Sequence, residues 1–315
     1  MRRTAFLVAA IFCLWPEAFY EIDYLWYFPY QELVVALMVL LGLKWIDRPR
    51  VKTVLPVGIT AGILALINVT PMPIFPVILA LPVLQRRENW KRVLGYGTVG
   101  ALTAFLIILP WLIRDAVVFH TIVPLRSNAG FQFWEGNNSD GCVREMASSH
   151  QPEIQRAEFQ RCRVMGEIAY SRQGYSDALA YIRKYPREAL VRTAERAYVF
   201  WLTDTFDQWK RDKGTKNWWD KGRPAIVRHL STSLGAWALA ILSLWAILSK
   251  RLENLPYKWL FVSILFILPF PYYFTLAENE YSQILRSWIL LLVILAFSAG
   301  FRRKSAGAEE ISSED

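Results

Sequence analysis

The sequence contains few of the residues that most often make covalent cross-links and metal sites. Only 3 of its 315 residues are cysteine, and only 3 are histidine. Three cysteines are too few for the disulfide framework of a small secreted domain. His120, His150 and His229 lack the spacing at which two imidazoles on one helix bind zinc. The sequence therefore indicates no metal or other cofactor, although it leaves a divalent-metal requirement open.

The few thiols leave one pairing undecided. Cys142 and Cys162 share the polar middle of the chain, whereas Cys13 lies in an apolar run. A Cys142–Cys162 disulfide and two unpaired thiols are alternatives that the spacing does not separate.

The chain also lacks a continuous basic face. Lysine and arginine outnumber aspartate and glutamate by 36 to 27, which gives a net charge of +9. These basic residues occur in small clusters beside apolar runs, rather than along one helix or one face. We therefore expect no nucleic-acid partner.

Apolar and aromatic residues are abundant instead. Hydrophobic residues make up 54% of the chain and aromatic residues 15%, with 14 tryptophans. Most apolar runs approach the roughly 20 residues that a helix needs to cross a bilayer. The runs cover residues 4–20, 31–46, 53–69, 71–85, 93–113, 230–249, 258–275 and 282–300. They predict an all-α, polytopic membrane protein of about eight transmembrane helices.

The loops between these runs alternate in charge. Lysine and arginine gather in every second loop, as they do in cytoplasmic loops, and the opposite short loops are acidic or uncharged. Both termini are then expected in the cytoplasm. The boundaries that follow are a bundle of about five spans over 1–113, an extracytoplasmic segment over 114–229, a bundle of about three spans over 230–304 and a cytoplasmic tail over 305–315.

The extracytoplasmic segment is predicted to be mainly helical. Residues 121–152 are rich in turn-forming glycine and asparagine, which predicts an ordered loop. Residues 153–200 carry apolar positions at helical spacing, which predicts one or two amphipathic helices with a break near Gly174. The tryptophans between Tyr198 and Trp219 are typical of an anchor at the membrane surface.

Two motifs in a fixed order resemble a known family. Residues 109–115 read LPWLIRD, and residues 130–138 read GFQFWEGNN. Further along, residues 178–186 read ALAYIRKYP and are followed by Trp201. This pattern resembles the bacterial membrane glycosyltransferases of family 39, members of the GT-C superfamily that are similar to protein mannosyltransferases.

The resemblance implies an inverting transfer of a sugar from a polyprenyl-phosphate donor to an extracytoplasmic acceptor. It places the protein in the bacterial inner membrane, with the polyprenyl-phosphate-linked sugar and the lipid bilayer as its partners. That chemistry needs a carboxylate to deprotonate or orient the acceptor hydroxyl, and cations to stabilise the leaving phosphate.

The front of the chain departs from the family pattern. Family members begin with two further spans and carry the catalytic aspartate in the loop between them, whereas this chain resembles the family only from the third span on. No aspartate here matches that position. We expect a carboxylate near the same face to take its role, and the candidates are Asp23, Glu21 and Glu32, with Glu17 beside them.

The resemblance also predicts a set of substrate-binding residues. They are Arg114, Trp134, Gly136, Asn137, Asn138, Tyr281 and Arg286. Arg286 is a candidate substitute for the two arginines that the family carries in its last extracytoplasmic turn and that this chain lacks. The alternatives are structural: glycine and asparagine also form turns and caps, Arg114 can extend to the interface, and Arg286 can pair with a carboxylate.

Whether the protein is an enzyme stays open at this stage. The alternative is a truncated, non-catalytic homologue that binds a lipid-linked glycan or partners another membrane protein supplying the missing spans. A transporter is a third class, which the sparse intramembrane charges do not favour. The enzyme hypothesis requires an outward cavity lined by at least one carboxylate and one cation.

Overall fold

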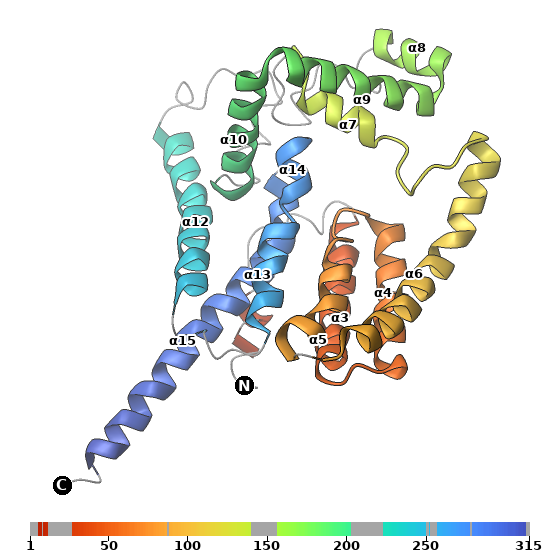
Figure 1. Ribbon diagram of the computed structural model, residues 1–315. Helices are drawn as coiled ribbons and strands as arrows, with labels where there is room; N and C mark the ends of the chain where they lie inside the picture. The colour runs from red at the N-terminus through yellow and green to blue at the C-terminus, as the bar shows by residue number, and fades with distance from the viewer. Residues whose placement is uncertain are drawn as a thin grey trace.

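The regular structure is helical throughout the part of the chain that the computed structural model describes, which confirms the all-α prediction (Figure 1). The described residues are 6–7, 9–11, 27–86, 88–139, 156–202, 223–249, 252, 257–277 and 279–312. Three predicted carboxylates, Glu17, Glu21 and Asp23, and the thiols of Cys13 and Cys142 lie outside these residues.

Four helices form one group. They are α3 (Phe28–Asp47), α4 (Val51–Ile67), α5 (Ile74–Arg86) and α6 (Trp90–Phe119). The closest crossing joins α4 to α6, where a Cβ on Gly58 would lie 2.4 Å from the Gly100 carbonyl oxygen. Small residues of this kind let two apolar helices approach at backbone distance. Glycine at position 58 therefore sets the spacing of this pair.

A second group contains the C-terminal helices. They are α12 (Arg223–Leu248), α13 (Lys258–Ile267), α14 (Phe270–Phe274), the short η4 (Asn279–Ser282) and α15 (Gln283–Ser312). The predicted apolar run over 258–275 is divided into α13 and α14 at Pro269, because proline removes a backbone donor from the helix. Helix α13 packs against α5, and this contact joins the two groups.

A third set of helices lies across one end of the molecule (Figure 1). These helices, named the α7–α10 layer, are α7 (Ala129–Gly136), α8 (Arg156–Met165), α9 (Glu167–Lys184) and α10 (Pro186–Leu202). The predicted loop over 121–152 thus contains a helix, α7. In Figure 1, α15 runs away from this layer toward the opposite end of the molecule.

The predicted helix break near Gly174 is wrong. Helix α9 continues through Gly174, and the chain breaks instead at Gly166, whose φ of 80° suits glycine. Gly174 serves packing, because a Cβ there would lie 3.2 Å from the carbonyl oxygen of Gly130 on α7. The helix boundaries also differ from the predicted segment limits, since α6 continues past residue 113 to Phe119 and α12 begins at Arg223.

Within the described residues, two helices, α3 and α6, are long and apolar enough to cross a membrane. Five shorter apolar helices accompany them, over residues Val51–Ile67, Ile74–Gln85, Leu234–Leu248, Lys258–Phe274 and Ile284–Ser298. The predicted total of about eight spans therefore stays a prediction.

Candidate functional site

A cluster of polar side chains lies where α3 begins, α4 ends and α14 ends. The Asn68 amide donates a hydrogen bond to the Gln31 side-chain oxygen at 2.7 Å, and both residues are buried. The Asn68 oxygen in turn accepts from the Thr70 backbone N–H at 3.1 Å. Side chains of Thr70 and Asn68 both hydrogen-bond to the Tyr272 hydroxyl. We call Gln31, Asn68, Thr70 and Tyr272 the polar cluster.

Aromatic rings continue from the polar cluster toward the α7–α10 layer. The rings of Tyr272 and Tyr281 stack at 4.3 Å, and Tyr281 also contacts Phe28 at 5.8 Å. On its other side Tyr272 stacks on Phe200 of α10 at 5.7 Å. Tyr281, a predicted substrate-binding residue, therefore lies within a continuous aromatic stack. Amides beside stacked rings supply both the polar and the apolar contacts that a sugar-like ligand can use.

Glu32 projects from the first turns of α3 toward α15. Its carboxylate accepts a hydrogen bond from the Ser287 hydroxyl. The other oxygen, Oε1, is buried and has no hydrogen-bond partner among the described residues. Burying an unsatisfied carboxylate oxygen is unfavourable. Such a position in a native fold is explained by a ligand, water or proton that the site takes up.

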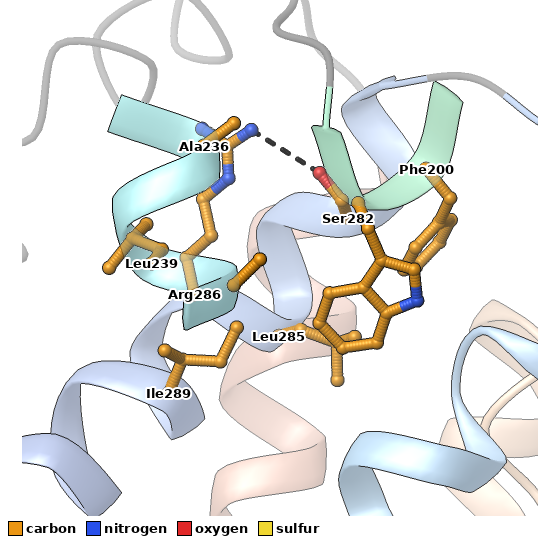
Figure 2. Close-up of a pocket in the computed structure, with 9 residues that line it drawn as sticks. Phe200, Ala236, Leu239, Ser282, Leu285, Arg286 and Ile289 are labelled. Carbon is orange, nitrogen blue, oxygen red and sulfur yellow. Dashed lines mark hydrogen bonds between the residues drawn. The ribbon is translucent and has the colours of Figure 1, made fainter. Parts of the chain in front are cut away.

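Arg286 and Ser287, the residue that contacts Glu32, lie on adjacent faces of α15. Consecutive residues of a helix point about 100° apart, so Arg286 and the Glu32 partner Ser287 leave α15 in different directions. The Arg286 side chain is only 6% exposed, and its guanidinium donates to the Ser282 hydroxyl at 3.3 Å (Figure 2). The guanidinium of Arg286 leaves one face of α15, and the carboxylate of Glu32 from α3 contacts Ser287 on the adjacent face.

A small open pocket with a cavity volume of about 20 Å³ lies beside Arg286. Apart from Arg286 and Ser282 its wall is apolar and comes from α10, α12 and α15, and the close-up shows Leu239, Leu285 and Ile289 below the guanidinium (Figure 2). The remaining lining residues are Phe200, Trp201, Ala236 and Ala240. One cation in an apolar wall suits a ligand with an anionic group and a hydrocarbon part.

Two arginines of α10 hold the predicted Gly-Asn-Asn motif in place. Arg196 is fully buried and donates to the carbonyl oxygens of Gly136 at 2.5 Å and Tyr273 at 2.8 Å. Arg192 donates to the Asn138 carbonyl oxygen and, at 2.6 Å, to Glu188. The motif thus joins α7 to α10 and α14 through its backbone carbonyls.

The side chains of the motif are engaged as well. The Asn137 amide donates to the carbonyls of Phe133 and Phe274, both at 2.8 Å, and the Asn138 amide donates to that of Trp134 at 3.0 Å. A Cβ on Gly136 would lie 2.0 Å from the Thr275 carbonyl oxygen, so glycine alone fits there. These contacts are the capping and close-approach roles of the structural alternative, and substrate binding by the motif stays a prediction.

Two further predicted residues lie apart from the polar cluster. Arg114, near the end of α6, makes an ion pair with the buried Asp115 at 2.7 Å and covers the Trp111 ring at 4.8 Å. In Figure 1 this end of α6 extends away from α14. Trp134 packs between helices instead, 6.0 Å from the Phe131 ring and against Gly174 of α9.

Burial shifts the pKa of groups in the α7–α10 layer. Desolvation, followed by the neighbouring charge of Arg192, lowers the pKa of Arg196 to about 10. Desolvation and the hydrogen bond from its hydroxyl to Glu158 raise the pKa of Tyr170 above its ordinary value. Arg196 therefore stays charged and Tyr170 stays neutral at physiological pH.

The polar cluster and the two buried arginines were not predicted from the sequence. Gln31 and Asn68 stand in otherwise apolar surroundings, and a polar residue in such a run is a signal of a buried contact. Arg192 and Arg196 are four residues apart, which places both on one helix face. No group of three or more histidine, cysteine, aspartate or glutamate side chains able to hold a metal occurs in the described part of the chain.

Comparison with known proteins gives no relative for this chain: no family model, curated protein or solved structure matches it.

Proposed function

We propose that the protein is a membrane glycosyltransferase that moves a sugar from a polyprenyl-phosphate donor to an extracytoplasmic acceptor hydroxyl. The observation that carries the proposal is Glu32, whose carboxylate contacts Ser287 of α15 and has a buried oxygen without a hydrogen-bond partner among the described residues. Glu32 reaches one face of α15, and the buried Arg286 leaves the same helix one residue earlier. The chemistry needs a carboxylate and a cation, and the proposal assigns these roles to Glu32 and Arg286, although Glu32 does not line the Arg286 pocket.

In this reaction Glu32 accepts the proton of the acceptor hydroxyl. The acceptor oxygen bonds to the anomeric carbon while the bond from that carbon to the donor phosphate oxygen breaks. The polyprenyl phosphate leaves with the bonding electron pair, and Arg286 stabilises its negative charge.

We also propose that the helices are inserted in the bacterial inner membrane as a multi-pass bundle. Large apolar side chains are exposed along the outer faces of several helices, including Leu37 and Leu40 on α3 and Ile59 and Ile63 on α4. Contiguous apolar surface of this kind indicates contact with lipid or another protein. Both termini are then cytoplasmic, and the α7–α10 layer lies outside.

The test is sugar transfer by the purified protein in lipid nanodiscs, using a panel of polyprenyl-phosphate sugars. Glu32→Gln keeps the shape of the side chain and removes the base, so we expect the turnover number to fall by at least about 100-fold. The matched control is Glu88→Gln, a change of the same kind before α6, which should keep wild-type turnover. Transfer by Glu32→Gln at the wild-type rate would exclude Glu32 as the base.

The same assay separates the second candidate, a non-catalytic protein that binds a lipid-linked glycan. The apolar pocket around Arg286 favours lipid binding with or without catalysis. Donor binding without transfer to any acceptor, in the wild type, would support the binding protein over the enzyme.

A further inference from the structure

Helix ends of the first group meet at one end of the molecule. A Cβ on Gly58 would lie 2.4 Å from the Gly100 carbonyl oxygen, and one turn later a Cβ on Gly62 would lie 2.9 Å from that of Ala104. The chain separation is 42 residues in both contacts, so α4 and α6 run parallel. The start of α6 is therefore level with the turn that joins α3 to α4. In Figure 1 this end lies away from the α7–α10 layer.

This end carries a dense group of exposed cations, which we call the basic end. Its members are Lys44, Arg48, Arg50, Lys52, Lys91 and Arg92. Among the described residues, none of the six forms an ion pair. Only two acidic residues, Asp47 and Glu88, lie beside them in the sequence, and Asp47 accepts a hydrogen bond from the Tyr257 hydroxyl. The basic end therefore presents an excess of positive charge to its surroundings.

The opposite ends of α3, α4 and α5 carry no cation. Neither lysine nor arginine occurs in residues 27–31, where α3 begins, or in residues 66–76, which join α4 to α5. Cations that only kept a protein soluble would need no such segregation. Their collection at one end of apolar helices indicates a negatively charged partner at that end.

Large apolar side chains border the basic end. Leu84, near the end of α5, is 72% exposed, and Leu94, one turn into α6, is 61% exposed. The exposed Trp90 ring lies 5.8 Å from the Lys91 ammonium. Tryptophan rings in such places are typical of the boundary between headgroups and hydrocarbon. A ligand at this end therefore meets cations first and apolar surface further along the helices.

We propose that the basic end binds the headgroup of an anionic phospholipid, whose acyl chains lie along the exposed leucines. The inference rests on the membrane insertion proposed above and is independent of sugar transfer. Lysine and arginine donate charge-assisted hydrogen bonds to phosphate oxygens, and a headgroup of net negative charge gains more from unpaired cations than a zwitterionic one. A nucleic acid or an acidic peptide would engage the cations and leave the leucines uncovered.

The test measures the affinity of the full chain in detergent for phosphatidylglycerol and phosphatidylcholine with identical acyl chains, by native mass spectrometry. We expect the wild type to bind phosphatidylglycerol at least about 10-fold more tightly. Lys91→Gln combined with Arg92→Gln should reduce this preference by about fivefold or more, because each cation near a lipid headgroup contributes a factor of that size. Equal affinities of the wild type for the two lipids, or an unchanged preference in the double variant, would overturn the proposal.

The matched control is Arg183→Gln combined with Lys184→Gln. Both residues are exposed at the end of α9, so this variant removes the same charge from the α7–α10 layer. It should keep the wild-type preference for phosphatidylglycerol. An equal loss in the two double variants would overturn the site, because the preference would then follow the net charge of the chain.

Competition with soluble polyanions separates a lipid from other acidic partners. Poly-glutamate and a short single-stranded oligonucleotide carry the charge of a headgroup without its hydrocarbon chains. Neither should displace bound phosphatidylglycerol from the wild type, because the apolar contacts of the acyl chains add to the charge contacts. Displacement by either polyanion would overturn the assignment to a lipid.

The two proposals fail in different ways. If the wild type transfers no sugar while its preference for phosphatidylglycerol depends on Lys91 and Arg92, the transferase proposal fails and the lipid site stands. If transfer depends on Glu32 and the two lipids bind equally, the lipid site fails and the transferase proposal stands. A chain that does not insert into nanodiscs would overturn both.

Discussion

Arg196 donates hydrogen bonds to two backbone carbonyls and to two side-chain oxygens. Its guanidinium connects Gly136 at the end of α7 with Tyr273 of α14, and also donates to Asn137 Oδ1 at 3.4 Å. Only a planar group with several donors can reach these acceptors together. The buried charge is tolerated because these acceptors replace water.

Replacing Arg196 by methionine keeps much of the side-chain volume and removes every donor. We expect the free energy of unfolding to fall by about 3 kcal/mol, since buried carbonyls of two segments lose their partners. Thermal unfolding in detergent, compared with Arg183→Met at an exposed position of α9, measures the difference. A midpoint no lower than that of the control would show that the contacts with Gly136 and Tyr273 are not structural.

At the scale of elements, the packing of α8 on α9 includes a hydrogen-bonded pair and an ion pair of Arg161 with Asp177 at 4.0 Å. The Tyr170 hydroxyl donates to Glu158 at 2.8 Å, and Arg161 lies 5.9 Å from the Tyr170 ring. The helix α8 is short and mostly exposed, so few other contacts hold it to α9. Deprotonation of Tyr170 would place its phenolate beside the negatively charged carboxylate of Glu158.

This pair predicts a dependence on alkaline pH. Because burial and Glu158 raise the pKa of Tyr170, the folded state keeps a proton that the unfolded state releases near pH 10. The contribution to stability is fully present below about pH 10 and is lost as the pH rises through the folded pKa. Hydrogen exchange of α8 amides should therefore accelerate above about pH 10.

Tyr170→Phe provides the control for this effect. The variant has no phenol to titrate, so its α8 exchange should lack the alkaline step, once the intrinsic pH dependence of exchange is subtracted. The same step in both proteins would assign it to another group.

At the scale of the whole molecule, the α7–α10 layer and the last residues of α15 lie at opposite ends (Figure 1). The basic residues at the ends of α3 and α4, such as Arg48 and Lys52, belong to the loops predicted to be cytoplasmic. A bundle in this orientation places Glu32 and the polar cluster toward the extracytoplasmic end of the helices. The proposed topology therefore decides which substrates reach the site.

Cysteine labelling tests this orientation. Lys184→Cys on α9 and Lys52→Cys on α4 place thiols at exposed positions, after the three natural cysteines are changed to serine. A membrane-impermeant maleimide should label Lys184→Cys in spheroplasts and Lys52→Cys only after lysis. The reverse pattern would contradict the topology, and labelling of both in intact spheroplasts would contradict membrane insertion of α4.

The sequence by itself determined the helical class and much of the placement of the helices. Apolar runs of sufficient length favour helices because every backbone group is then satisfied within the segment, and this pattern is local. The prediction of helix boundaries was weaker at glycines. Glycine ends a helix at Gly166, whereas at Gly174 it lets another helix pack closely. Which role applies depends on the neighbouring helix.

Only the tertiary structure decided which polar residues meet. Glu32 was a candidate because it is a carboxylate near the expected face, but its partner Ser287 lies on α15 and its open oxygen results from packing. Such contacts join residues distant in sequence, and their geometry is fixed by the packing of whole helices, which no local pattern of residues encodes.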